Sequence, residues 1–200
     1  AILIHYSTDF VFDGSKKESY KEDDSPNPIN VYGESKLGGE REIIKVGGEH
    51  FIFRTSWLYS TRRDCFVTKV LKWARTYEKM KIVADQIGSP TWSRSLADAT
   101  AQALLVIKLS DQTWRKEKAG IYHLAGNGSV DRYEWAKSIL DFDPRKEEHI
   151  VKEVQKANSE DFNTAARRPE HSALDCSLFQ ETFDTFYADW KDTLAVALSI

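Results

Sequence analysis

The chain has 200 residues, of which 41% are hydrophobic and 30% charged, and its formal net charge is −3 at pH 7. This composition is typical of a soluble globular protein of one domain or a small two-part unit. Because the basic residues are scattered and no apolar run approaches membrane-spanning length, we expect neither nucleic acid nor a membrane as a partner. Cys65 and Cys176 match no metal or redox spacing, so we expect two free thiols in a reducing cytoplasm.

The first quarter of the chain predicts two strands and one helix. Residues 1–7 form a continuous apolar run that is typical of a buried parallel strand. A polar loop follows over 13–30, and helical spacing of apolar residues predicts a helix over 31–46. The aromatic and β-branched run at 51–55 predicts the second strand.

The rest of the chain continues the alternation of helices and strands. We expect helices at 64–79, 96–109 and 131–141, strands at 82–84 and 120–124, a turn-rich loop at 85–91, an irregular stretch at 143–172, and one or two helices in 175–198. Strands that alternate with helices of this length predict an α/β fold with a parallel sheet covered on both faces.

Tyr and Lys residues four apart occur four times, so this spacing alone is no signal of catalysis. The four pairs are Tyr32/Lys36, Tyr77/Lys81, Tyr133/Lys137 and Tyr187/Lys191. Only Tyr32/Lys36 follows, through a long loop, a buried strand that ends in the hydroxyl residues Ser7 and Thr8. Because catalytic groups gather at the carboxyl ends of parallel strands, we predict that Thr8, Tyr32 and Lys36 form a catalytic set.

The chemistry of these three groups suits reduction of a carbonyl by hydride transfer. A free phenol is a poor proton donor and acceptor at neutral pH, but a nearby ammonium favours its charged form. Lys36 would supply that ammonium and a donor for a cofactor ribose. Thr8 would hold the substrate oxygen while Tyr32 transfers the proton.

Sequence blocks that extend far beyond this set carry a family resemblance. They cover residues 7–14, 32–40, 53–59, 85–91, 96–98, 120–124 and 168–174. In this order the blocks resemble the dTDP-4-dehydrorhamnose reductases of the extended short-chain dehydrogenase/reductase superfamily. That family reduces a 4-keto nucleotide sugar with NADPH or NADH to dTDP-L-rhamnose, a precursor of cell-surface polysaccharide.

The resemblance implies a role for each candidate residue. Tyr32 would protonate the sugar oxygen, Lys36 would orient the nicotinamide ribose, and Thr8 and Asp9 would contact the substrate. Trp57 would lie against both nicotinamide and sugar, although a core aromatic at a strand end is an equal alternative.

The resemblance also suggests a residue that binds the phosphates of the nucleotide, a metal ion and an oligomeric state. Arg168 would meet the nucleotide phosphates, because Arg suits them geometrically, although a solvated Arg is an equal alternative. Some relatives bind Mg²⁺ through carboxylates at a subunit interface, but residues 91–96 of this chain carry none. The resemblance is also compatible with a homodimer.

The resemblance predicts a Rossmann-like NAD(P)-binding region and a smaller sugar-nucleotide region. The first would comprise residues 1–63 and 96–125, and the second residues 64–95 and 126–200. No Gly-rich cofactor turn precedes Thr8. We therefore expect the carboxy-terminal portion of a longer reductase, inactive by itself and without detectable binding of NAD(P)H.

Two alternatives remain open at this point. The segment 174–177 is similar to the tail of a non-catalytic relative that binds methionine adenosyltransferase, so a regulatory subunit is one alternative. Another nucleotide-sugar epimerase or a dehydratase is the second. Dehydratases of the superfamily follow Thr-Asp with Glu as the acid–base partner, and Phe10 at that position argues against dehydration.

Overall fold

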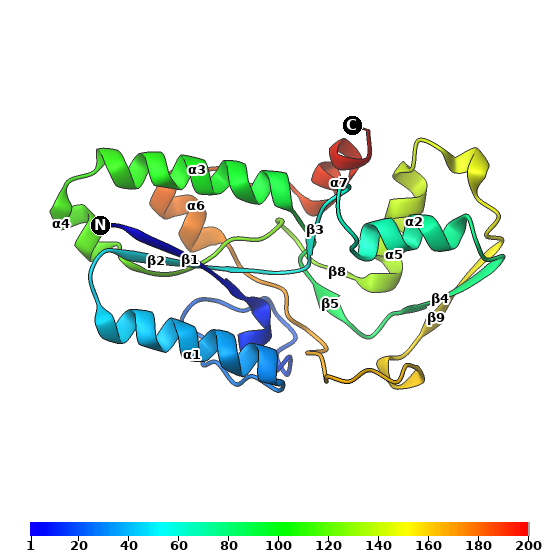
Figure 1. Cartoon of the computed structure of the whole chain (residues 1–200), viewed down its shortest axis with the longest axis horizontal. Coiled ribbons are helices and arrows are strands. Elements are labelled where there is room, and N and C mark those ends of the chain that lie inside the picture. The colour runs from blue at the N-terminus through cyan, green and yellow to red at the C-terminus, as the bar shows by residue number, and fades with distance from the viewer. Residues whose placement is uncertain (200) are drawn as a thin grey trace.

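The structure is a computed structural model that describes residues 1–199, and its centre is a three-stranded parallel sheet (Figure 1). The strands β1 (Leu3–Thr8), β2 (His50–Thr55) and β7 (Gly120–His123) lie in the order β1-β2-β7. Thr8 lies opposite Thr55, so β1 and β2 end level with each other. The carboxyl ends of the strands therefore form one edge of the sheet, where α/β proteins place their sites.

Helices cover both faces of this sheet, as the sequence predicts (Figure 1). On one face α3 (Ser93–Leu109) and α6 (Ser177–Phe183) pack against Phe51 and Phe53 of β2. On the other face lies α1 (Val31–Val46). The predicted α/β class with a covered parallel sheet is confirmed.

Both ends of α1 are fixed by local sequence. The side chain of Asn30 accepts a hydrogen bond of 2.8 Å from the backbone N–H of Gly33 and so caps the helix. Gly47 ends it with φ 74°, a conformation that glycine adopts without steric cost. Inside the protein, Glu40 of α1 binds Arg54 of β2 in a fully buried bidentate ion pair, with N–O distances of 2.9 and 2.7 Å. The helix that carries Tyr32 and Lys36 is thereby held on the sheet.

A second region lies beyond the carboxyl ends of the sheet strands (Figure 1). Its strands β4 (Lys79–Val83) and β9 (Glu153–Ala157) pair in parallel, and α2 (Phe66–Ala74) and α5 (Arg132–Phe142) lie beside them with α7 (Trp190–Ser199). These elements share a separate apolar core whose buried members are Tyr59, Val67, Val70, Ala74, Met80, Ile82, Trp135, Ala136, Ile139, Trp190, Leu194, Ala197 and Leu198. The remaining short elements are the 3-10 helices at Asp9–Val11, Lys146–Glu148 and Ser159–Asp161, the helix α4 (Gln112–Glu117), and the strand pairs β3 (Leu58–Tyr59) with β6 (Thr91–Trp92) and β5 (Ile87–Gly88) with β8 (Val130–Asp131).

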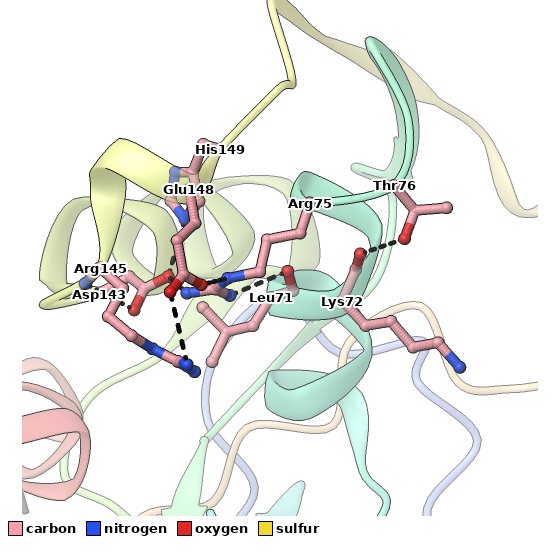
Figure 2. Close-up of polar contacts among 8 residues, drawn as sticks. All are labelled: Leu71, Lys72, Arg75, Thr76, Asp143, Arg145, Glu148 and His149. Atoms are coloured by element: carbon pink, nitrogen blue, oxygen red, sulfur yellow. Dashed lines mark hydrogen bonds and ion pairs between the residues drawn. The ribbon is translucent and has the colours of Figure 1, made fainter.

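A polar network ties the end of α2 to the end of α5, as Figure 2 shows. Arg75 donates to Asp143 and to Glu148, both at 2.5 Å, and His149 contacts the same Asp143 oxygen at 2.7 Å. Burial alone would raise the pKa of Asp143. The hydrogen bonds from His149 and from the backbone of Arg145, together with the charge of Arg75, outweigh burial, and the pKa of Asp143 is lowered.

Two predicted stretches are wrong. The helix predicted over 64–79 ends at Ala74, because Met80 and Ile82 alternate with exposed lysines and point into the core as a strand, β4. The stretch 143–172, predicted to be irregular, contains β9, which forms because β4 offers it a pairing edge. Helix α4 was also not predicted. Nowhere in residues 1–199 is a helix both long and apolar enough to span a membrane.

Candidate functional site

Two neighbouring cavities open at the carboxyl end of the sheet. The strand-end cavity has a volume of about 530 Å³ and is lined by residues that include Thr8, Tyr32 and Lys36. Of the four Tyr/Lys pairs, only Tyr32/Lys36 lines it. The three predicted catalytic side chains thus share one cavity, although their catalytic role stays a prediction.

Thr8 ends β1 and at the same time caps the short 3-10 helix that follows. Its Oγ1 accepts a hydrogen bond of 3.2 Å from the backbone N–H of Phe10 and donates one of 3.1 Å to Oδ1 of Asp9. Thr8 is almost fully buried, and it is one of the residues that line the strand-end cavity. These two contacts fix the rotamer of Thr8.

Tyr32 and Lys36 stand one helical turn apart at the start of α1. The Lys36 ammonium donates a hydrogen bond of 2.5 Å to the backbone carbonyl of Tyr6 on β1. The Tyr32 side chain is 55% exposed, and its ring contacts Phe10 edge-on at 6.0 Å between centroids. The phenol hydroxyl has no hydrogen-bond partner among the residues that the structure describes. It is therefore available to a molecule in the cavity.

Asp9 is a buried carboxylate at the base of the same cavity. Its Oδ2 accepts hydrogen bonds from Ser172 at 2.5 Å and from Ser56 at 2.8 Å, and its Oδ1 accepts the bond from Thr8. Burial raises the pKa of Asp9, and the three hydroxyl donors act in the opposite direction. Both oxygens of Asp9 are thus engaged by the protein. Its predicted contact with substrate stays a prediction.

Trp57 lines both the strand-end cavity and the second cavity. Its φ is 40°, a strained conformation for a residue with a side chain. Its indole ring approaches Gly88 so closely that a Cβ at that position would lie 2.3 Å from Cε2. The ring also stacks on Trp135 at 5.3 Å. Trp57 thus follows a strand, as predicted, and forms part of the wall of both cavities. Its contact with nicotinamide and sugar stays a prediction.

The second cavity has an aromatic wall, and we call it the aromatic cavity. Its volume is about 590 Å³, and its lining includes Trp57, Phe66, Trp73, Trp135 and Phe162. Trp57 lies between β2 and β3, and the other side chains come from α2, α5 and the segment before Arg168. Such a surface suits a flat ring that can stack on it.

Arg132 was not predicted, and it lines both cavities. Its guanidinium lies 4.0 Å above the centroid of Trp57 and 5.1 Å from that of Phe66, and its Nε donates to Oε1 of Gln86 at 3.0 Å. Burial, and then the charge of Arg168, lower the pKa of Arg132 to about 10, so the group still carries its charge at neutral pH. Within residues 1–199 it forms no ion pair.

A signal for Arg132 does exist in the sequence. Asp131 caps the N-terminus of α5, so Arg132 is the first residue of the helix. A cation there opposes the helix dipole and is the less favoured choice on stability grounds. The choice becomes favourable if an anion binds beside it.

Arg168 also lines both cavities, from an exposed position. It likewise has no carboxylate partner in the described part of the chain. Two guanidinium groups without ion-pair partners therefore flank the junction of the cavities. This arrangement favours a bound anion such as a diphosphate, for which Arg geometry is well suited.

The structure also gives the surroundings of the segment that resembles the regulatory relative, and of the residues that could bind a metal ion. Leu174 and Cys176, from the segment that resembles the regulatory relative, are buried in the core, whereas Ser177 of the same segment is exposed. Within residues 1–199, no three His, Cys, Asp or Glu side chains are grouped so as to hold a metal ion. Mg²⁺ binding therefore rests on the family resemblance alone.

Comparisons with known proteins agree on one family. The sequence matches the family described as RmlD substrate binding domain over residues 1–200. It is 36% identical to dTDP-4-dehydrorhamnose reductase from Burkholderia thailandensis, over 95% of this chain and 64% of that protein. It is also 36% identical to the reductase of the same name from Escherichia coli K12, over 96% of this chain and 62% of that protein. The chain thus spans less than two thirds of the length of these relatives.

Solved structures give the same result. The dTDP-4-dehydrorhamnose reductase from Bacillus anthracis, determined in complex with NADP, has a TM-score of 0.85 and 32% identity, over 100% of this chain and 66% of that chain. A UDP-N-acetylglucosamine 4-epimerase from Bacillus cereus, with a TM-score of 0.70 and 18% identity over 98% of this chain and 63% of that chain, shares the fold alone. Since the family match extends over the whole sequence, the chain belongs to the RmlD substrate binding domain family.

Proposed function

We propose that the protein containing this chain reduces dTDP-4-dehydro-L-rhamnose to dTDP-L-rhamnose with NADPH or NADH, in the cytoplasm. The observation that carries the proposal is the strand-end cavity, which brings Thr8, Tyr32 and Lys36 together and joins the aromatic cavity at two unpaired arginines. The relatives that match most of the chain are named for this reaction. Residues 1–63 and 96–125 would serve the cofactor, and residues 64–95 and 126–200 the sugar nucleotide.

Tyr32 is the proposed general acid. Its hydroxyl is exposed to the cavity and free of protein partners, so it can give its proton to the C4 oxygen of the sugar. The Lys36 ammonium stands on the same face of α1, where it favours the charged phenolate that remains after transfer. Its hydrogen bond to the Tyr6 carbonyl holds the ammonium at the wall of the cavity.

The residues present fit the nicotinamide half of a dinucleotide. The cavity is open at the exposed Tyr32 and closes at the buried Thr8, which leaves room for a flat ring and a sugar beside Trp57. When bound, NAD(P)H supplies the hydride. Lys36 would donate a hydrogen bond to the ribose, and Trp57 would limit how deep the ring enters.

The sugar nucleotide would extend from the strand-end cavity into the aromatic cavity. Arg132 and Arg168, at the junction, would bind its diphosphate by charge-assisted hydrogen bonds. The aromatic wall would stack on the base. Asp9 is the weakest member of the proposed substrate contacts, because three protein hydroxyls already occupy its oxygens.

The test is an assay of NAD(P)H oxidation with dTDP-4-dehydro-L-rhamnose, using the complete polypeptide to which these residues belong. Tyr32→Phe should lower kcat on the order of 10²-fold or more, because the general acid is removed. The melting temperature should stay the same, because the lost hydroxyl has no partner in residues 1–199. Tyr133→Phe, in another Tyr/Lys pair that does not line the strand-end cavity, is the matched control. If Tyr32→Phe kept the activity of the unaltered enzyme, the assignment of Tyr32 would be wrong.

A further inference from the structure

Gln86 contacts Arg132 through both its backbone and its side chain. Strand β5 pairs with β8 in an antiparallel register that places Ile87 opposite Asp131, so Gln86 lies opposite Arg132, where α5 begins. The backbone carbonyl of Gln86 accepts a hydrogen bond of 3.2 Å from the N–H of Arg132, and its Oε1 accepts one of 3.0 Å from Nε of the guanidinium. The start of the helix and the end of the Arg132 side chain are thus bound to one residue.

The amide of Gln86 is bound in turn by Ser159 and Asp85, and we call these three residues the Arg132 anchor. Nε2 of Gln86 donates to Oγ of Ser159 at 2.8 Å. Ser159 donates to Asp85 twice, from Oγ to Oδ1 at 2.7 Å and from its backbone N–H to Oδ2 at 2.8 Å. Asp85 lies between β4 and β5, and Ser159 opens the 3-10 helix that follows β9. The anchor therefore joins three segments that are far apart in the sequence.

The hydrogen bonds of the Arg132 anchor fix the orientation of the Gln86 amide. A guanidinium donates hydrogen bonds and never accepts them, so the amide oxygen faces Arg132 and the NH₂ group faces Ser159. The Ser159 hydroxyl accepts from that NH₂ group, and its own single hydrogen points to the carboxylate of Asp85. A flipped amide would set its NH₂ group against the donor of Arg132. Gln86 is only 7% exposed, so water competes little for these bonds.

The Arg132 anchor uses Nε of the guanidinium and leaves its two terminal nitrogens to a ligand. Trp57 and Phe66 lie beside the guanidinium, at 4.0 and 5.1 Å from their ring centroids. Nη1 and Nη2 form no hydrogen bond within residues 1–199. Since the guanidinium is planar, a contact at Nε also fixes the directions of the other N–H bonds. Those bonds are therefore oriented before an anion reaches the junction of the two cavities.

The anchor holds Arg132 without neutralising it. A carboxylate in direct contact with Arg132 would form an ion pair and compete with an incoming phosphate for the same donors. The amide of Gln86 offers an acceptor that carries no charge. The carboxylate of Asp85 is separated from Arg132 by the side chains of Gln86 and Ser159. The positive charge of Arg132 thus stays available to a ligand.

We propose that Gln86, Ser159 and Asp85 are positioning residues for Arg132, and that they raise the affinity of the cavity junction for the diphosphate of a nucleotide. They order the long side chain of Arg132 before the ligand arrives, so less conformational freedom is lost on binding. This inference rests on the proposed function, which supplies the diphosphate. Asp85 lines neither cavity and acts through Ser159 and Gln86.

Asp85→Ala tests the anchor without altering a cavity wall. We expect calorimetry on the complete polypeptide to show an affinity for dTDP about 2- to 10-fold lower, because a long side chain must then be ordered on binding. The KM for the sugar nucleotide should rise by the same factor, and kcat at saturation should stay the same. Gln86→Met keeps the length of the side chain, removes both amide contacts and should weaken binding at least as much. In that background Asp85→Ala should have no further effect, because Asp85 acts through Gln86.

The matched control is Asp161→Ala. Asp161 belongs to the same 3-10 helix as Ser159, and its Oδ2 accepts the backbone N–H of Asn158 at 2.8 Å. This variant also loses one negative charge and one acceptor for a backbone N–H, but Asp161 lines neither cavity and lies outside the anchor. Its affinity for dTDP should equal that of the unaltered protein. Equal losses in Asp161→Ala and Asp85→Ala, an unchanged affinity in Asp85→Ala, or additive losses with Gln86→Met would overturn the proposal.

A measurement without ligand tests the anchor separately from the reaction. In NMR spectra of labelled arginine, the Nε–H of Arg132 should exchange slowly with water in the unaltered protein and in Asp161→Ala, and faster in Asp85→Ala and Gln86→Met. Fast exchange in the unaltered protein would refute the inference even if the enzyme were active. An unaltered enzyme that fails to reduce the keto sugar would refute the proposed function, while the dTDP titration and the exchange rates would still decide the inference.

Discussion

Arg132→Met is the most informative single change, because it separates substrate binding from stability. Methionine keeps an unbranched side chain that can lie between Trp57 and Phe66, but it removes the positive charge. The only side-chain hydrogen bond that Arg132 makes in residues 1–199 is to Gln86, so little else is lost. Any large effect on nucleotide affinity therefore reports the missing charge.

The size of the effect follows from the charged hydrogen bonds. A hydrogen bond to a charged group contributes about 1.5–3 kcal/mol, and about 1.4 kcal/mol changes an equilibrium constant tenfold. We therefore expect the affinity for dTDP, measured by calorimetry, to fall about 10- to 150-fold. The KM for the sugar nucleotide should rise in parallel, and kcat at saturation should change little.

Although Arg132→Met should bind dTDP more weakly, its folded state should be as stable as that of the unaltered protein, or more stable. Burial and the charge of Arg168 lower the folded-state pKa of Arg132 to about 10, below its ordinary value, so folding disfavours its charge at neutral pH. Replacing an unpaired, half-buried charge with an apolar group should keep or raise the melting temperature. Arg94→Met is the control: Arg94 lies 5.8 Å from the Trp92 ring but lines neither cavity. Unchanged dTDP affinity in Arg132→Met would refute the diphosphate assignment.

Three further predictions concern residues outside the proposed catalytic set that stabilise the fold or position Trp57. Glu40→Ala leaves the fully buried Arg54 without a partner and should cost about 3–5 kcal/mol in the free energy of unfolding, measured by urea denaturation. Because the folded-state pKa of Asp143 is lowered, its carboxylate stabilises the fold above its ordinary pKa of 3.8, and this contribution should be lost as the pH falls through the folded-state value. Denaturation curves between pH 3 and pH 7 should show that loss in the unaltered protein and a weaker pH dependence in Asp143→Asn. Gly88→Ala would place a Cβ 2.3 Å from the Trp57 ring, so it should displace that ring and lower both the melting temperature and the activity; unchanged values would contradict the close packing.

Helix α1 was predictable to the residue because its end signals are local. Asn30 caps its start, and Gly47 has a positive φ of 74° at its end, which glycine adopts without steric cost. The strand β1 was predictable from its continuous apolar run, but the prediction that it is buried is wrong for most of its length: β1 lies at the edge of the sheet, and only Ser7 and Thr8 are buried. The catalytic candidates followed from these two elements, since a parallel sheet brings the end of β1 beside the start of α1.

The errors fall where distant segments determine local structure. The five residues of β9 carry two charges and have no strand signal of their own, and they become a strand only because β4 lies 74 residues earlier in the chain with an open edge. The end of α2 was misjudged for a related reason. A helical pattern continues through the turn after Ala74, and only the burial of Met80 and Ile82 in the core shows where the strand begins.

The same distinction explains which site residues were missed. Thr8, Tyr32 and Lys36 lie close in sequence and share two elements, so their order along the chain was enough to bring them together. Arg132 and Ser172 enter the site only through contacts with Trp57 and Asp9 that span 75 and 163 residues. What distinguishes both is physical. Arg132 is a cation at the start of a helix, which weakens that helix unless an anion is bound. Ser172 is a buried serine whose hydroxyl, within residues 1–199, donates to a carboxylate beside the proposed catalytic threonine. The first feature is unfavourable for an isolated fold and favourable for a site that binds an anion. The second satisfies a buried hydroxyl and holds the carboxylate beside Thr8 in place.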